Sequence, residues 1–169
     1  LTEGYLPLRR SLARHLVQLG VSTSAQDILV TSGSQQGLHV AASALLREGD
    51  YVVVESPTYL GAIDILEFRG ARLLSVPMDD GGMRLDGLEN LILQYRPRLI
   101  YTMPTFHNPT GVSMEAERRR RLLTLAQRHG VPILEHDTCS ELRYDGPGLS
   151  PIKGHDTRGH VVYVGTLSK

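Results

Sequence analysis

The sequence has one cysteine, no tryptophan and only two phenylalanines among its 169 residues. Since the single thiol, Cys139, cannot form an internal disulfide bond, the composition favours a reducing compartment and predicts a cytoplasmic protein. No apolar run approaches the roughly 18 residues that a membrane-spanning helix needs, and no signal peptide is recognisable. The 18 basic residues balance the 18 acidic ones, so net charge does not direct the chain to nucleic acid or to a membrane. With 41% hydrophobic and 21% charged residues, the chain has the composition of one globular domain.

Basic residues are concentrated at one place, in a segment with a helical pattern. The run consists of Arg118, Arg119, Arg120 and Arg121. Such a run is most often a solvated helix face, and we expect that arrangement here.

Helical and strand patterns alternate along the chain. Leucines at positions 8, 12, 16 and 19 predict an amphipathic helix over residues 7–19. Further helices are expected over residues 38–46, 58–69, 85–95 and 115–129. Strands are expected over residues 28–31, 51–55, 72–76, 98–102, 131–135 and 161–164, all of them continuous apolar runs. This pattern predicts a three-layer α/β/α sandwich with a mainly parallel central sheet, and the Gly- and Pro-rich residues 145–159 are expected to form a surface loop.

A turn rich in small polar residues follows the first expected strand and opens a helix. Ser34 and Gln35 supply side-chain donors there, and the free N–H groups of a helix N-terminus favour an anion. No lysine of the nucleotide-binding kind follows, which excludes a P-loop. An ordinary helix-capping turn explains the same residues equally well.

Candidate binding residues also follow the other expected strands, and ligands of open α/β sheets bind at the carboxyl ends of strands. They are Tyr59, Asn108 within the rigid turn of residues 103–111, His136 and Asp137, Thr166, and Lys169. Taken singly, Tyr59 is explained as a core or surface tyrosine, and Asn108 as a turn residue.

These motifs occur in the order in which one protein family carries them. They are Gly4 with Leu8-Arg9, Ser32-Gly33-Ser34-Gln35-Gln36, Ser56-Pro57-Thr58-Tyr59, Asn108-Pro109-Thr110-Gly111, Glu135-x-Asp137 with Glu141-Leu142-Arg143-Tyr144, and Thr166-x-Ser168-Lys169. Unrelated folds have no reason to place all of them at these strand ends. The chain therefore resembles the fold-type-I pyridoxal 5'-phosphate (PLP) enzymes of the class I/II aminotransferase group over essentially its whole length.

The resemblance implies a role for each candidate in binding PLP, the cofactor that carries the electron-sink chemistry. Ser34, Gln35 and Thr166 would hold the cofactor phosphate at the helix N-terminus. Lys169 would form the internal aldimine and later move a proton at the α-carbon of the substrate. No residue is implied as a metal ligand.

The pyridine ring of the cofactor would be held by two further residues. Tyr59 would stack on the ring. Asn108 would donate a hydrogen bond to the phenolic oxygen of the ring and so keep the aldimine planar.

The sequence departs from the family at the residue that meets the pyridine nitrogen. The family has an aspartate there, which keeps the ring cationic, whereas this chain has His136 followed by Asp137. Either Asp137 reaches the ring through a local bulge, or His136 serves as the partner. Thr138 and Cys139 stand where the family often has a tyrosine beside the phenolic oxygen. We therefore hypothesise weakened or altered transamination.

The resemblance also predicts how residues 1–169 fit into a longer protein. They would form part of the large, cofactor-binding domain, with the C-terminal small domain and its substrate-binding arginine beyond Lys169. Family members build the site at a dimer interface, which implies a homodimer. A fragment without those parts is expected to have no turnover by itself.

Two functions of different classes fit the resemblance. The first is an aminotransferase that acts on an α-amino acid and a 2-oxo acid. The second is the effector-sensing domain of a MocR/GntR-type transcriptional regulator, in which a winged helix-turn-helix domain precedes the PLP-binding domain and only that upstream domain binds nucleic acid. A non-catalytic remnant is a third alternative, which the set of Ser34, Asn108 and Lys169 disfavours.

Overall fold

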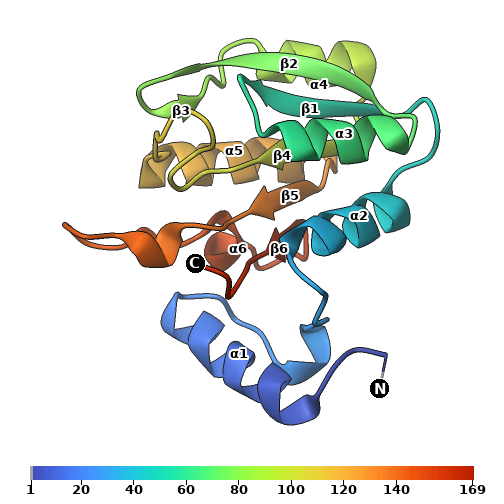
Figure 1. Cartoon of the computed structure of the whole chain (residues 1–169). Coiled ribbons are helices and arrows are strands. Elements are labelled where there is room, and N and C mark those ends of the chain that lie inside the picture. The colour runs from blue at the N-terminus through green and yellow to red at the C-terminus, as the bar shows by residue number, and fades with distance from the viewer. Residues whose placement is uncertain (1) are drawn as a thin grey trace.

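The computed structural model describes residues 2–169, which form a six-stranded sheet between two layers of helices (Figure 1). The strand order is β3-β2-β1-β4-β5-β6, and all pairs are parallel except β2 with β3. This arrangement confirms the predicted three-layer, mainly parallel α/β fold. The strands are β1 (Tyr51–Ser56), β2 (Arg72–Asp79), β3 (Gly82–Met83), β4 (Leu99–Thr102), β5 (Ile133–His136) and β6 (Val161–Val164).

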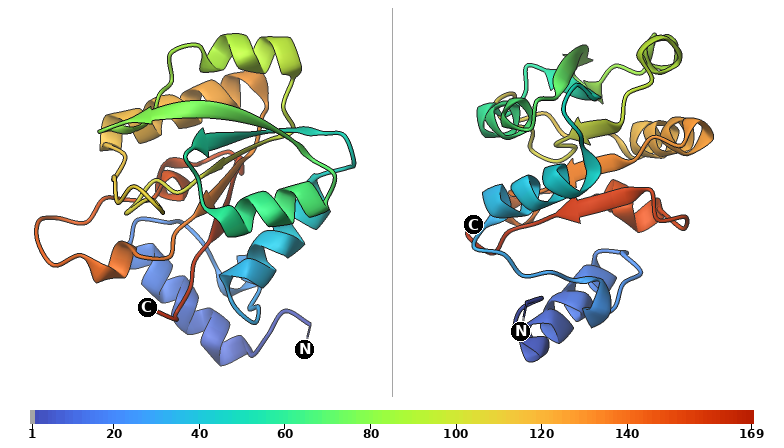
Figure 2. Two further views of the ribbon diagram at one scale, coloured as in Figure 1. Left: turned by 45° about the horizontal axis from the view of Figure 1, so that its top comes forward. Right: turned by 90° about the vertical axis from the view of Figure 1, so that its right-hand side faces the viewer.

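Helices cover both faces of the sheet, with α2 and α3 on one side and α4, α5 and α6 on the other (Figure 2). Within residues 2–169, none of the helices is long and apolar enough to cross a membrane. The helices are α1 (Leu6–Gln18), α2 (Ser34–Leu45), α3 (Leu60–Phe68), α4 (Leu88–Tyr95), α5 (Ala116–His129) and α6 (Ile152–His155), with 3-10 turns at Ala25–Asp27 and Ser140–Leu142.

Alternation along the buried strands divides the core in two. In β1, Val53 packs with α4 and α5, while Val52 and Val54 pack with α2 and α3 on the opposite face. Because both faces of the strand are covered, the run Tyr51-Val-Val-Val is apolar throughout, as is expected for a strand inside a parallel sheet.

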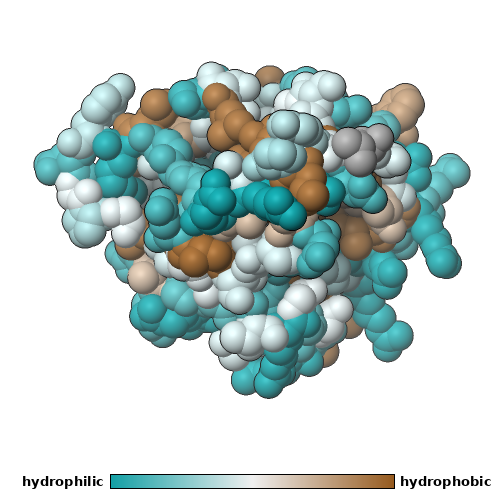
Figure 3. Space-filling view, turned by 90° about the horizontal axis from the view of Figure 1, so that it is seen from below, coloured by the Kyte–Doolittle hydropathy of each residue, from teal (hydrophilic) through white to brown (hydrophobic). Residues whose placement is uncertain are grey.

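Helix α1 lies beyond the β6 end of the sheet, apart from the two helical layers (Figure 1). Several of its apolar side chains are exposed, among them Leu6 and Val17. The face seen from this end is mainly polar and carries separate apolar patches (Figure 3). Exposed apolar groups of this kind are typical of surfaces that contact another part of a protein or a partner.

The expected strand over residues 28–31 is wrong, because this segment is extended but outside the sheet. Val30 makes one backbone hydrogen bond to Glu3, and Leu29 is half exposed. A β-branched apolar run predicts extended backbone; only a neighbouring strand with free backbone groups makes it part of a sheet.

The expected surface loop over residues 145–159 is also partly wrong, because it contains the short helix α6, in which Ile152 is buried. The carboxylate of Glu135, at 0% exposure in β5, accepts hydrogen bonds of 2.8 Å from the backbone N–H groups of Ile152 and Lys153. Burial raises the pKa of Glu135 to about 7. The segment is therefore fixed by a polar contact with a residue 17 positions away.

Asp156, directly after α6, supplies a pH-dependent contribution to stability. Its side chain has no exposed surface and accepts hydrogen bonds from the backbone N–H groups of Val161 (2.8 Å) and Arg158 (3.0 Å) and from Lys153 Nζ (3.2 Å). Burial opposes ionisation, but these hydrogen bonds outweigh it and lower the pKa of Asp156 to about 2 from an ordinary 3.8.

We expect Asp156→Asn to lower the free energy of unfolding of the full-length protein by about 1 to 2 kcal/mol at neutral pH. A depressed carboxyl pKa stabilises the fold above the unfolded value, so the difference should disappear as pH falls from 4 towards 2. Urea denaturation at several pH values measures this. The exposed Asp80, changed to Asn, is the control and should have little effect at any pH; an equal effect of both changes would contradict the assignment.

Candidate functional site

The carboxyl ends of β1, β4, β5 and β6 lie along one edge of the sheet, where the strand order reverses between β1 and β4. Such a reversal is where parallel α/β sheets bind ligands. The predicted site residues lie at this edge: Ser34 and Gln35 in the first turn of α2, Tyr59 at the start of α3, Asn108 in the loop after β4, His136 at the end of β5 and Asp137 after it, and Thr166 and Lys169 after β6.

The first turn of α2 has no side chain capping its backbone N–H groups. Gly33 occupies the N-cap position with φ of 117°, a conformation that a residue with a Cβ atom rarely adopts. Gly37 allows this turn to approach β6, because a Cβ there would lie 3.1 Å from Val164. The uncapped N–H groups therefore suit an anion.

Tyr59 connects this turn with the end of β5. Gln35 Nε2 donates a 3.0 Å hydrogen bond to the Tyr59 hydroxyl, and the Tyr59 ring lies 5.8 Å from the His136 ring, centroid to centroid. Gly61 leaves room for the tyrosine, since a Cβ at that position would lie 2.7 Å from the Tyr59 ring. The structure thus brings Gln35, Tyr59 and His136 together.

His136 is buried, and one of its ring nitrogens has no partner among residues 2–169. Nδ1 lies 3.0 Å from the Tyr101 hydroxyl, whereas the buried Nε2 makes no hydrogen bond. Burial lowers the pKa of His136 to about 4, although the negative charge of Asp137 acts in the opposite direction. The imidazole is therefore neutral at neutral pH and presents an unsatisfied polar atom beside Tyr59, which costs about 1 to 3 kcal/mol unless a ligand satisfies it.

The carboxylate of Asp137 makes its hydrogen bonds on a different side of the strand from the His136 ring. Oδ1 accepts from the backbone N–H of Ser140 at 3.1 Å, and Oδ2 accepts from the Tyr163 hydroxyl at 3.0 Å. This orientation continues the alternation of β5, in which neighbouring side chains point to opposite faces. His136 is consequently the residue of the pair that faces Tyr59.

Glu55 was not singled out in the sequence, yet it supports the loop that carries Asn108. This carboxylate is 1% exposed and accepts from Thr102 Oγ1 at 2.7 Å and from the Met103 backbone N–H at 3.0 Å. His107 Nε2 lies 3.3 Å from Glu55 Oε2, without hydrogen-bond geometry. The sequence signal that could have identified Glu55 is a glutamate at the end of an otherwise apolar strand.

Arg119 holds the same loop from α5, and the expectation of a solvated arginine run is wrong at this position. The side chain is 0% exposed. Its guanidinium donates to Met114 O (2.8 Å), Pro104 O (2.7 Å), Thr105 Oγ1 (2.9 Å) and Ser150 O (3.2 Å). Position 119 shares helical spacing with the buried residues 122, 123 and 126, and this periodicity could have identified it.

The other candidates lie outside the group formed by Gln35, Tyr59 and His136. The side chains of Asn108 and Lys169 are exposed, and within residues 2–169 neither makes a hydrogen bond or ion pair with the other candidates. Thr166 bonds only within its own turn, where its hydroxyl donates to Ser168 Oγ at 3.1 Å.

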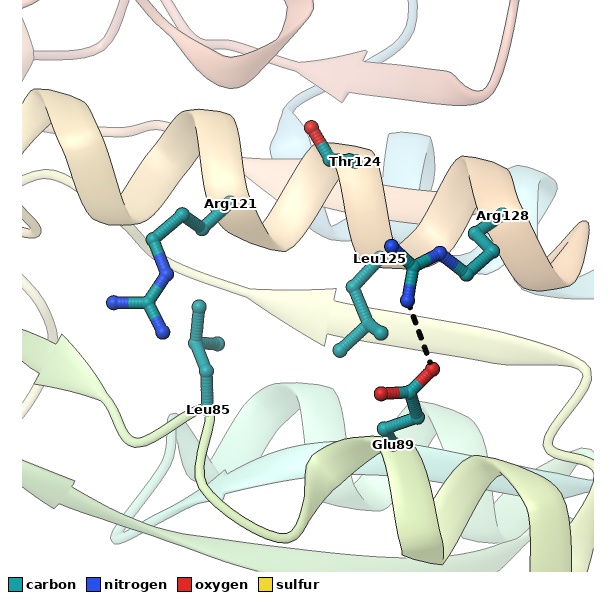
Figure 4. A pocket seen from close by; sticks show the side chains of 6 residues that line it. All are labelled: Leu85, Glu89, Arg121, Thr124, Leu125 and Arg128. Atoms are coloured by element: carbon teal, nitrogen blue, oxygen red, sulfur yellow. Dashed lines mark hydrogen bonds and ion pairs between the residues drawn. The ribbon is translucent and has the colours of Figure 1, made fainter.

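A separate hollow lies between α4 and α5, on the face of the sheet opposite α2 and α3 (Figure 4). Glu89 there pairs with Arg128 at 3.2 Å and with His129 at 2.9 Å. Of the polar residues that line it, Glu89 and Arg128 are thus paired with each other, and none of the predicted site residues lines it.

Known proteins match this chain over nearly all of its length. The family model for aminotransferase class I and II matches residues 2–169. An aromatic-amino-acid aminotransferase of Thermococcus litoralis is 40% identical over 99% of this chain and 42% of its own length. The uncharacterized HTH-type transcriptional regulator YdfD of Bacillus subtilis is 36% identical over 99% of this chain and 35% of its own.

Solved structures give the same result. The kynurenine aminotransferase of Pyrococcus horikoshii, crystallised in complex with PMP, superposes with a TM-score of 0.93 and 41% identity. The match covers 99% of this chain and 43% of that protein. The chain therefore spans less than half the length of the relatives it matches.

We expect Arg119→Met to lower the free energy of unfolding by roughly 3 kcal/mol or more, because it leaves several buried oxygen acceptors without a donor. The neighbouring Arg120, exposed and paired with Glu117, is the matched control, and Arg120→Met should cost at most about 0.5 kcal/mol. Urea denaturation of the full-length variants measures both. Equal losses would mean that Arg119 does not hold the Asn108 loop.

Proposed function

Because the chain belongs to the aminotransferase class I and II family, we propose that the full-length protein is a PLP-dependent aminotransferase that acts on an α-amino acid and a 2-oxo acid. The observation that carries the proposal is the buried Nε2 of His136, which has no hydrogen-bond partner among residues 2–169. It lies beside Tyr59, at the edge of the sheet where the uncapped N-terminus of α2 also lies. A flat, anionic cofactor with a ring nitrogen fits these three features together.

When bound, PLP supplies the electron sink for chemistry at the substrate's α-carbon. The residues of this chain bind and orient it. Ser34, Gln35 and Thr166 would hold the phosphate together with the N–H groups of α2, which no side chain caps. Lys169 would hold the cofactor and would move a proton at the substrate α-carbon.

The ring is held from three sides. Tyr59, fixed by its hydrogen bond from Gln35, covers one face of it. Asn108, presented by the loop that Glu55 and Arg119 hold, donates to the phenolic oxygen. His136, rather than Asp137, meets the ring nitrogen, which the engagement of both Asp137 oxygens supports.

Residues 1–169 form the cofactor-binding part of a large domain, and the small domain lies in the remainder of the full-length protein. The protein is a cytoplasmic homodimer. The free thiol of Cys139 and the exposed apolar side chains Leu6 and Val17 of α1 support these two assignments. The two aminotransferases compared above are named for aromatic amino acids and kynurenine, so these compounds are the first substrates to test.

A second candidate is the effector-sensing domain of a MocR/GntR-type regulator. It is favoured by the 36% identity to an HTH-type regulator over 99% of this chain and by a neutral histidine where a carboxylate is expected. Sequence before Leu1 distinguishes the two, since a basic, helix-rich DNA-binding domain would precede the sensor.

Visible absorption of the full-length protein with PLP tests the proposal. We expect a band from the lysine-bound cofactor that is lost in Lys169→Arg and retained in Lys153→Arg, the matched control. Addition of an aromatic amino acid should convert the band to the pyridoxamine form. A band that shifts without conversion would favour the regulator, and absence of any band in the unmodified protein would refute cofactor binding.

A further inference from the structure

The Tyr101 hydroxyl and His136 Nδ1 form an isolated pair inside the core. Tyr101 is 0% exposed in β4, and within residues 2–169 its hydroxyl has no hydrogen-bond partner other than Nδ1, at 3.0 Å. Burial, together with the charge of Glu55, raises the pKa of Tyr101, so the phenol keeps its proton. The pair therefore contains two protons, one on the phenol and one on the neutral imidazole.

Only one of these protons can lie between the two atoms. If Nδ1–H donated to the phenol oxygen, the phenol proton would point into the core with no acceptor, which costs about 1 to 3 kcal/mol. If the phenol donates to Nδ1, the imidazole proton lies on Nε2, the nitrogen beside Tyr59. The second arrangement leaves a single unsatisfied group, and that group faces the site.

We propose that Tyr101 is a positioning residue that fixes His136 as its Nε2–H tautomer, so that His136 donates a hydrogen bond to an unprotonated pyridine nitrogen of the cofactor. This inference rests on the proposed PLP site. An acceptor at Nε2 completes the hydrogen bonding of both buried side chains, whereas a protonated pyridine nitrogen would require the other tautomer and would leave the phenol proton without a partner.

The charge of Asp137 and burial act in opposite directions on the pKa of His136, and burial decides the outcome. The carboxylate of Asp137 favours a protonated His136, but burial lowers the pKa of the imidazole to about 4. Asp137 itself is turned away towards Ser140 and Tyr163. Asp137 is thereby not the residue of the pair that faces Tyr59, where the proposed ring would lie.

An unprotonated ring is a weaker electron sink than a pyridinium. An unprotonated ring would therefore slow removal of the substrate's α-proton. It would still allow a substrate amine to exchange with the amine of Lys169. His136 and Tyr101 would thus set the ratio between ligand exchange and amino transfer.

Nitrogen-15 NMR of the full-length protein loaded with PLP labelled at the ring nitrogen tests this directly. We expect the unmodified protein to give the resonance of an unprotonated pyridine. His136→Asp should move it to the protonated position, and Tyr101→Phe should move it part of the way, because it frees the tautomer. Tyr95→Phe, which removes a tyrosine hydroxyl from the end of α4, on the side of the sheet opposite α2 and α3, should leave the resonance unchanged.

A protonated ring nitrogen in the unmodified protein would overturn the inference while leaving the proposed function intact. The tautomer is also measurable without cofactor, in histidine-labelled full-length protein, where the His136 signals are those lost in His136→Gln. Protonated Nε2 with unprotonated Nδ1 supports the inference even if PLP fails to bind, which would refute only the proposed function. The opposite tautomer refutes the inference.

Discussion

The site depends on one buried cation, the guanidinium of Arg119. It donates to oxygens from the beginning and the end of the Asn108 loop and from the segment before α6, and so connects three parts of the chain that no strand pairing joins. Burying such a charge is unfavourable unless its donors are satisfied, and here four acceptors satisfy four of its five N–H groups. Glu55 also binds this loop, through the Met103 backbone N–H. The position of Asn108 therefore depends on the buried side chains of Arg119 and Glu55 and not on the loop alone.

A continuous chain of contacts then leads from the surface into the sheet. Gln35 bonds Tyr59, the Tyr59 ring lies beside His136, and His136 pairs with Tyr101 in β4. Gln35 and Tyr59 lie at the starts of α2 and α3, and His136 and Tyr101 lie in neighbouring strands, so the sheet and the helices packed on it set their spacing. An aspartate at position 136, as the family has, would place a negative charge in the middle of this series of contacts. The present sequence places a neutral imidazole there.

The sheet and most helices could be predicted because strands covered on both faces are apolar runs separated by amphipathic segments. What could not be predicted depends on distant partners. Residues 28–31 have strand-like composition but no neighbouring strand, and α6 forms where Glu135 can accept its first N–H groups. The candidate residues were visible as motifs, but the Tyr101 contact that sets the state of His136 spans 35 positions.

Because β6 is an edge strand, its surroundings affect the backbone of Lys169, which follows it. Within residues 2–169, β6 has a neighbouring strand on one side only, and Thr166 and Lys169 follow it directly. A strand added at that edge, from the same polypeptide or another, would restrain β6 from both sides and damp the motion of the lysine's backbone. The mobility of the Lys169 backbone would then respond to assembly at the edge of the sheet, so a change in quaternary contacts there would reach the proposed site without contacting its ligand.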